Sequence, residues 1–204
     1  MNILVVGPGA MGCLFAARLK IAGYKVALFD HNTERVEVLN SRGIMVEGVT
    51  GEYSVNVPAV SEEAFFRPYF VIICVKSTNT EEAARSVKQW ISPQSIVVTL
   101  QNGIGNLEIL RDIFGQNKVL GGVTAEGATV LDWGRIKHAG QGATVIGPGK
   151  TPDSPAEKLA SAFRQAGFDT RAEDNKHIIL PNKTNPGNTG KAFFQDWCRI
   201  YTNP

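Results

Sequence analysis

Residues 2–12 of the chain read NILVVGPGAMG, and this stretch decides the fold. Ile3–Val6 is a continuous apolar run of the kind found in short buried strands. From Ala10 to Ala22 apolar residues recur at helical spacing, and a second apolar run, Val26–Phe29, follows. Two parallel strands need a crossover, which is usually a helix. We therefore expect a strand, a helix and a parallel strand within about 30 residues.

The turn between the first strand and the helix has the pattern G-x-G-x-x-G. Its residues are Gly7, Pro8, Gly9, Ala10, Met11 and Gly12. The first glycine permits a tight turn, the second lets the backbone touch a pyrophosphate, and the third lets the helix pack closely on the strand. Free N–H groups at the helix N-terminus favour anions. In this context the motif predicts a dinucleotide-binding loop, and the alternative is a glycine-rich turn without a ligand.

Asp30 ends the second strand. An acid about 20 residues beyond the glycines usually bonds the ribose 2′-OH of NAD and repels the 2′-phosphate of NADP. Arg35 and His31 could instead contact a 2′-phosphate, and Asp30 could also cap the helix that follows, for which Asn32 or Thr33 are the other candidates. On this one residue the sequence leans towards NAD.

The remaining pattern predicts an α/β fold: a Rossmann-type, doubly wound, mostly parallel sheet with an antiparallel extension. Apolar runs predict further buried strands, and amphipathic stretches predict helices between them. We expect strands at 69–75, 95–100, 119–124 and 168–171, and helices at 31–41, 78–90, 105–114 and 155–166. The glycine-containing stretch 43–60 suggests a short antiparallel excursion. Short segments at 128–130, 135–138 and 143–146 are expected to extend the sheet as antiparallel strands.

Lys76 and Asn102 follow two of the expected strands, 69–75 and 95–100. Open α/β sheets bind ligands at the carboxyl ends of their strands. A lysine there can hold a carboxylate or a ribose hydroxyl, and an asparagine can donate to a carbonyl. Alternatively, Lys76 is a solvated strand end and Asn102 belongs to a turn. Beside a dinucleotide loop, the two residues together favour a role in binding.

Composition excludes several classes of protein. The 204 residues are 43% hydrophobic and carry a net charge of +2, which excludes a disordered chain and makes nucleic acid an improbable main partner. Cys13, Cys74 and Cys198 lie far apart, so no disulfide framework and no metal site is expected, which fits the cytoplasm. No apolar run reaches 18 residues and no signal peptide is recognised, so we expect no membrane partner.

Four further motifs occur in order along the chain. They are Val75-Lys76-Ser77, the run 101–105 (QNGIG), the run 122–128 (GVTAEGA) and the pattern of 134–147 (GRIKHAGQGATVIG). Together with the first glycines they resemble the N-terminal domain of the ketopantoate reductases, also called 2-dehydropantoate 2-reductases. The resemblance covers residues 1–175. It implies an oxidoreductase that uses NADPH to reduce a small 2-keto acid, 2-dehydropantoate, to pantoate on the route through pantothenate to coenzyme A.

The resemblance also implies roles for particular residues. Residues 7–12 would hold the pyrophosphate, Lys76 and Asn102 would contact cofactor and substrate near the nicotinamide, and Ala128 would make a backbone contact with the cofactor. The family often carries an arginine after the second strand and prefers NADPH. This chain has Asp30 at that place, so NADP is implied by the family and NAD by the residue.

Composition changes after Asn175, where Asn, Pro, Thr and Lys become frequent. We therefore divide the chain into a dinucleotide-binding domain, 1–175, and an irregular tail, 176–204, that replaces the helical substrate domain of the family. Counted without gaps, Lys183 falls where the family has its proton-donating lysine, although Pro181 stands in place of the family's tryptophan. Lys183 is the candidate catalytic residue. A truncated or frame-shifted product, with weak or no turnover, is the hypothesis that follows.

Two other functions remain open at this stage. One is a non-catalytic dinucleotide-binding module or fragment. The other is a β-hydroxyacid dehydrogenase, which shares the G-x-G-x-M-G pattern, although the run 122–128 and the pattern from His138 to Gly147 argue against it. His138 itself is expected to be a structural histidine in a hairpin rather than a general acid. The sequence predicts no oligomeric state.

Overall fold

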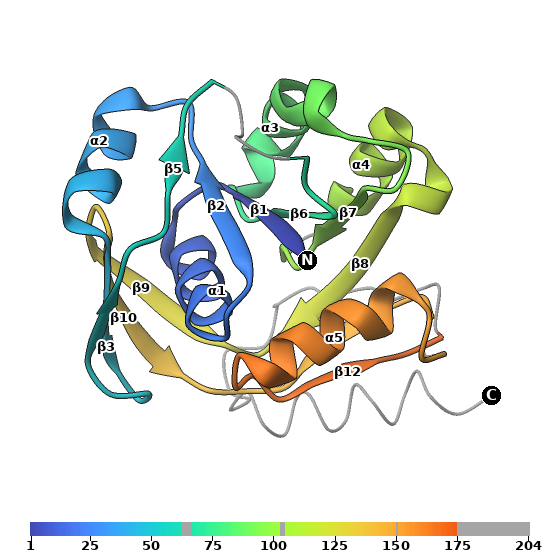
Figure 1. Cartoon of the computed structure of the whole chain (residues 1–204). Helices are drawn as coiled ribbons and strands as arrows, with labels where there is room; N and C mark the ends of the chain where they lie inside the picture. Colours follow the sequence, from blue (N-terminus) through green and yellow to red (C-terminus); the bar gives the residue numbers. More distant parts are fainter. Residues whose placement is uncertain (63–66, 103–104, 150, 175–204) are drawn as a thin grey trace.

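The computed structural model describes residues 1–62, 67–102, 105–149 and 151–174, and in these residues an eight-stranded sheet runs through the molecule (Figure 1). In order across the sheet the strands are β12 (Thr170–Ala172), β11 (Thr144–Gly147), β8 (Val119–Thr124), β7 (Ile96–Thr99), β6 (Phe70–Ile73), β1 (Asn2–Val6), β2 (Lys25–Phe29) and β5 (Ala59–Val60). The first strand of the chain therefore lies between β6 and β2, well inside the sheet.

Neighbouring strands of this sheet are parallel, except that β11 is antiparallel to β8. Val5 of β1 pairs with Leu28 on one side and Ile72 on the other. The predicted fold class, a mostly parallel Rossmann-type sheet with an antiparallel extension, is confirmed. Parallel strands align their carboxyl ends, so the loops after β2, β1, β6 and β7 emerge at one edge.

Helices cover both faces of the sheet because successive residues of each buried strand point to opposite sides. Ile3 and Val5 belong to the core that includes residues of α1 (Ala10–Ile21) and α5 (Pro155–Gln165). Leu4 and Val6 belong to a second core with residues of α3 (Thr80–Val87) and α4 (Asn106–Phe114). The continuous apolar runs found in the sequence are the signature of strands buried on both faces.

A second, four-stranded sheet lies beside α1. Its order is β4 (Tyr53–Val55), β3 (Ile44–Gly48), β10 (Arg135–Gly140) and β9 (Gly127–Asp132). The expected antiparallel excursion at 43–60 is confirmed for β3 and β4, whereas Ala59–Val60 form β5 and pair in parallel with β2 of the main sheet. The expectation that 128–130 and 135–138 extend the main sheet was wrong: β10 pairs in parallel with β3, with Ile136 opposite Val46. In the described residues, β11 and the neighbouring β12 run antiparallel to the other strands of the main sheet.

Helix α1 is enclosed between the two sheets, as Figure 1 shows, since β9 and β10 pass along the side of α1 that the main sheet leaves open. Gly12–Ala17 is buried without interruption, which a helix with a single apolar face would not show. Enclosure fixes the N-terminus of α1 at the carboxyl edge of the sheet.

The other described helical segments are short or peripheral. Helix α2 spans Thr33–Arg42, and the single 3-10 turns are η1 (Ser77–Asn79), η2 (Lys88–Trp90) and η3 (Gln116–Lys118). Within the described residues, no helix combines the length and the apolar character needed to cross a bilayer.

Candidate functional site

The loop between β1 and α1 is shaped by its three glycines in different ways. Gly7 has φ 94°, a conformation that L side chains rarely adopt. A Cβ on Gly12 would lie 2.1 Å from the carbonyl oxygen of Gly7, so the helix could not approach the strand as it does. A Cβ on Gly9, in contrast, would have no atom of the described residues within 4 Å. Gly7 and Gly12 therefore serve the protein's own packing, whereas the backbone at Gly9 is accessible to a ligand.

The first turn of α1 follows directly on Gly9. Its N-cap, Gly9, offers no side-chain hydrogen bond, and no acidic residue lies in the first turn. The N–H groups at the start of a helix have no partner inside the helix, and the helix dipole makes this end electropositive. The arrangement suits an anion such as a pyrophosphate.

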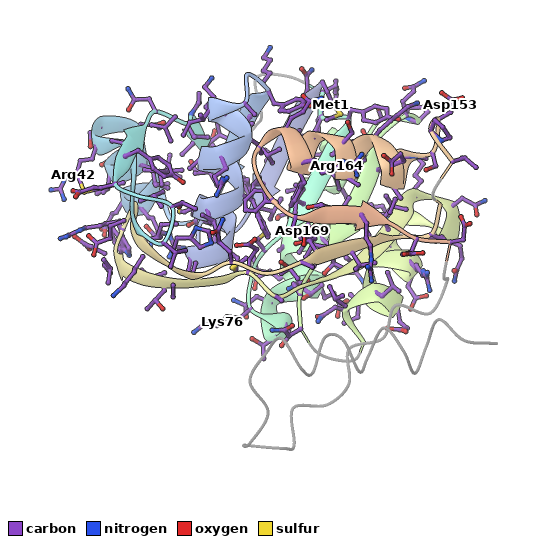
Figure 2. All side chains as sticks on the ribbon, turned by 90° about the horizontal axis from the view of Figure 1, so that it is seen from below. Met1, Arg42, Lys76, Asp153, Arg164 and Asp169 are labelled. Carbon is purple, nitrogen blue, oxygen red and sulfur yellow. The ribbon has the colours of Figure 1, made fainter. Side chains whose placement is uncertain are left out.

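A cavity of about 350 Å³ lies over this loop. Several parts of the chain line it: Val6–Gly9, the end of β2 with Asp30, Arg35 of α2, the segment after β6 with Lys76, and one face of α3. Figure 2 shows Lys76 and Met1 at opposite margins of the molecule, as expected when one follows a strand's carboxyl end and the other precedes a strand. The structure thus brings Gly7, Pro8, Gly9, Asp30 and Lys76 together around one cavity.

Asp30 is buried at the β2 end of the cavity, with 3% of its side chain exposed. Its Oδ2 forms an ion pair with Nε of Arg35, and its Oδ1 accepts from the backbone N–H of Asn32 at 3.0 Å. His31 Nδ1 lies 3.5 Å from Oδ1. Asp30 does not cap the following helix: Asn32 does, through Oδ1 accepting from Arg35 N at 2.8 Å. Asp30 is therefore a carboxylate at the cavity wall whose charge Arg35 balances.

Two free cysteines lie behind the glycine loop. Burial raises the pKa of Cys74, which lines the cavity, to about 12. Burial also raises the pKa of Cys13 to about 12, and its Sγ donates to the carbonyl oxygen of Pro8 at 3.3 Å. Because the thiolate is the reactive form, neither cysteine is a nucleophile at neutral pH.

Residues 3–151 match the model of the family described as "Ketopantoate reductase PanE/ApbA". The chain belongs to the ketopantoate reductase family. Relatives named 2-dehydropantoate 2-reductase include that of Pyrococcus horikoshii, 33% identical over 177 residues, and that of Aquifex aeolicus, 35% identical over 188 residues.

These alignments cover most of this chain and a smaller share of each relative. The Pyrococcus alignment covers 86% of this chain and 57% of the relative, and the Aquifex alignment covers 90% and 59%. The chain thus spans less than two thirds of the length of these reductases.

Solved structures agree with the family assignment. A PanE/ApbA family ketopantoate reductase from Ralstonia eutropha is 31% identical with a TM-score of 0.78, over 86% of this chain and 57% of that one. A D-mandelate dehydrogenase solved with NADH and anilino(oxo)acetate is 26% identical with a TM-score of 0.79, over 87% and 58%. The fold and a nicotinamide dinucleotide as the ligand of this type of domain are therefore supported.

Other residues singled out from the resemblance to the reductase family lie apart from the cavity. Ala10, Met11 and Gly12 form the first turn of α1, just beyond the loop. Asn102 follows β7, one strand further along the same edge, and is not among the described residues lining the cavity. Ala128 lies in β9 and packs against the core around α1. Lys183, and with it the tail 176–204, falls outside the described residues.

Sequence reasoning missed the contribution of α3 to the cavity in this reductase-family domain. Glu82 and Ser86 line its wall opposite the loop, with Asn79 and Ala83 beside them. Glu82 and Ser86 are spaced i, i+4 and so share one face of α3. That polar face, next to the expected Lys76, was the available signal. Among the described residues no three His, Cys, Asp or Glu side chains gather closely enough to hold a metal ion.

Proposed function

We propose that this chain binds a nicotinamide dinucleotide over the loop 7–12 and is the cofactor-binding part of a 2-dehydropantoate 2-reductase. The observation that carries the proposal is the open approach to Gly9, in the wall of a cavity and at the uncapped N-terminus of α1. Family membership supports the reaction, and the NADH in the D-mandelate dehydrogenase structure supports the ligand.

The order of the strands gives the dinucleotide a direction. The pyrophosphate would lie on the amides of residues 7–12 and the adenosine ribose beside Asp30, after β2. The nicotinamide would then point towards the ends of β6 and β7, where Lys76 and Asn102 lie. The backbone contact of Ala128 with the cofactor, implied by the family, is part of the same proposal.

For the choice of cofactor, we propose that NADH binds more tightly than NADPH. A 2′-phosphate beside Asp30 would meet a buried carboxylate, and Arg35, the cation that could compensate, is already paired with it. The resemblance to the family implies NADPH instead. Titration of the chain with both cofactors decides between the two.

The chemistry divides between the cavity and the rest of the protein. The bound dinucleotide supplies the hydride. The ammonium of Lys76 would attract the carboxylate of a 2-keto acid, and the amide of Asn102 would donate to its carbonyl oxygen. A positioned general acid contributes about 10²–10⁴-fold, and Lys183 is the candidate for that role. Because Lys183 lacks the family's surrounding motif, we propose that the 204 residues bind cofactor but turn over substrate slowly or not at all.

Calorimetric titration with NADH and NADPH tests the binding proposal. Gly9→Ala should weaken both cofactors by at least about tenfold, since the added methyl would occupy the space of the pyrophosphate. Gly140→Ala is the matched control, because a Cβ at Gly140 also meets no atom of the described part of the chain within 4 Å, and Gly140 lies in β10, outside the cavity lining. Equal affinities in wild type and Gly9→Ala would refute the site.

The likeness to D-mandelate dehydrogenase favours a second candidate function, the NADH-linked reduction of a different 2-keto acid to a D-2-hydroxy acid. Turnover with 2-dehydropantoate and with an aryl 2-keto acid separates the two. A chimera carrying the C-terminal region of the Aquifex relative is the positive control. Binding by the chain without turnover by the chain or the chimera would identify a non-catalytic module.

A further inference from the structure

A series of hydrogen bonds joins the two loops that follow β6 and β7. Gln101 Nε2 donates to the carbonyl oxygen of Val75 at 2.7 Å and to Thr80 Oγ1 at 3.0 Å. Thr80 Oγ1 donates to Asn106 Oδ1 at 2.9 Å, and Asn106 Nδ2 donates to the carbonyl oxygen of Asn102 at 3.1 Å. The series therefore starts beside Lys76, which follows Val75 in the sequence, and ends on Asn102 itself.

Two of the three side chains of the network are buried, Gln101 is half-buried, and the donors and acceptors match. Thr80 is fully buried, and Asn106 is 4% exposed. Gln101 Oε1 accepts from Thr99 Oγ1 at 2.9 Å, which sets the orientation of the amide so that its nitrogen faces Val75 and Thr80. A buried polar network with all members satisfied specifies one arrangement, because any other leaves a buried group unpaired.

Two residues of the network begin helices, so the network can fix the loops that precede those helices. Thr80 is the first residue of α3 and Asn106 is the first residue of α4, so their hydrogen bond ties two helix N-termini together. Each of these helices follows a loop that carries a predicted binding residue. An apolar contact between the helices would hold them together without fixing the loops.

We propose that Thr80, Gln101 and Asn106 are positioning residues that hold Lys76 and Asn102 at the separation required by the nicotinamide and the 2-keto acid. The inference rests on the proposed function, which places the nicotinamide at the ends of β6 and β7. It concerns one half of the ligand only. The glycine loop and Asp30, which would bind the pyrophosphate and the adenosine ribose, follow β1 and β2 and contribute no residue to these hydrogen bonds.

The test compares NADH with ADP-ribose, which lacks the nicotinamide, by calorimetry on the full chain. Thr80→Val keeps the shape of the side chain and removes its hydroxyl. It should weaken NADH by about tenfold and leave ADP-ribose within about twofold of wild type. Thr80→Ser, which keeps the hydroxyl, should restore the affinity for NADH. Thr170→Val is the matched control, since Thr170 is 4% exposed and its Oγ1 has no hydrogen-bond partner among the described residues.

Each result decides a different point. Equal weakening of NADH and ADP-ribose by Thr80→Val would give the network a purely structural role and overturn the proposal, while leaving the proposed function intact. No binding of either ligand by the wild-type chain would overturn both. If Thr80→Val does not fold, as judged by its thermal unfolding, Asn106→Ala provides the same comparison, with the same selective loss of NADH expected.

Discussion

In residues 1–62, 67–102, 105–149 and 151–174, two buried carboxylates have basic partners, and the two pairs lie in different surroundings. Asp30 pairs with Arg35 at the cavity, and Glu126 pairs with His138 Nε2 at 2.6 Å between the end of β8 and β10. The carboxylate side chains are 3% and 2% exposed. Their partners differ: the side chain of Arg35 is 29% exposed, whereas that of His138 is completely buried.

The Asp30–Arg35 pair is available to a ligand, whereas the Glu126–His138 pair stabilises the fold. His138 Nδ1 lies 2.9 Å from Thr50 Oγ1, and the second oxygen of Glu126 accepts from Gly142 N at 3.4 Å. These contacts join the second sheet to the segment that follows β8. None of the four residues in contact (Thr50, Glu126, His138 and Gly142) lines the cavity. The structure therefore places His138 as a structural histidine, as its hairpin position suggested. Asp30 and Arg35, in contrast, both line the cavity, and the side chain of Arg35 is partly exposed there.

The largest expected effect comes from breaking the buried pair of Glu126 and His138. His138→Ala leaves Glu126 buried without its main partner, and removing one member of a buried acid–base pair costs about 3–5 kcal/mol. The midpoint of thermal unfolding should fall sharply. Below that midpoint the affinity for NADH should remain that of wild type, because the cavity is lined by other residues.

Glu126→Gln sharpens the same comparison. The amide can still hydrogen-bond His138, so the variant should lose less stability than His138→Ala. A His138→Ala protein with unchanged unfolding but weakened NADH binding would reverse the assignment and make His138 part of the site.

The second effect comes from breaking the pair at the cavity. Asp30→Ala removes the carboxylate beside the proposed ribose site and frees Arg35 to pair with a 2′-phosphate. The ratio of the NADH and NADPH affinities should move towards NADPH by about tenfold. Calorimetric titration of each variant with both cofactors measures it.

The control is a matched ion pair outside the cavity lining. On the second sheet, Nη2 of Arg135 lies 2.9 Å from Oε2 of Glu47. Glu47→Ala breaks this pair and should leave the ratio of the NADH and NADPH affinities unchanged. A ratio that also stays constant in Asp30→Ala would show that the adenosine ribose does not lie beside Asp30.

Local patterns predicted one of these regions and not the other. The strand, glycine loop and helix of residues 2–21, the following strand and Asp30 were all evident because neighbouring residues encode them. The parallel pairing of Val46 with Ile136 joins residues far apart in the chain, and the alternation of a strand does not name its partner. The contact between Glu126 and His138 depends on that strand pairing, so the sequence did not predict it.

The cavity was likewise predictable only in part. The loop glycines and Lys76 could be placed at strand ends, because parallel strands align those ends. The contact between Thr80 and Asn106 could not, since it depends on how α3 and α4 approach each other. Glu82 was not predicted for the same reason. Its place in the cavity lining depends on the direction in which α3 leaves its loop.

The smallest expected effect tests whether Asp30 alone fixes Arg35. The guanidinium carbon of Arg35 also lies 6.0 Å from the ring centroid of Trp133, in the turn between β9 and β10. Such a cation–π contact at an exposed site contributes about 0.5–1 kcal/mol. Trp133→Ala should therefore lower the free energy of unfolding by about that amount, measured by chemical denaturation, and leave the ratio of NADH and NADPH affinities within about twofold of wild type.

Trp133→Phe keeps an aromatic face and should retain most of the stability, whereas Leu131→Ala, an exposed change in the same hairpin, should have little effect on either quantity. A shift in the cofactor ratio as large as that of Asp30→Ala would mean that Trp133 holds Arg35 in place. The second sheet would then take part in nucleotide selection. The Asp30–Arg35 pair at the cavity would depend on the second sheet, as the Glu126–His138 pair does.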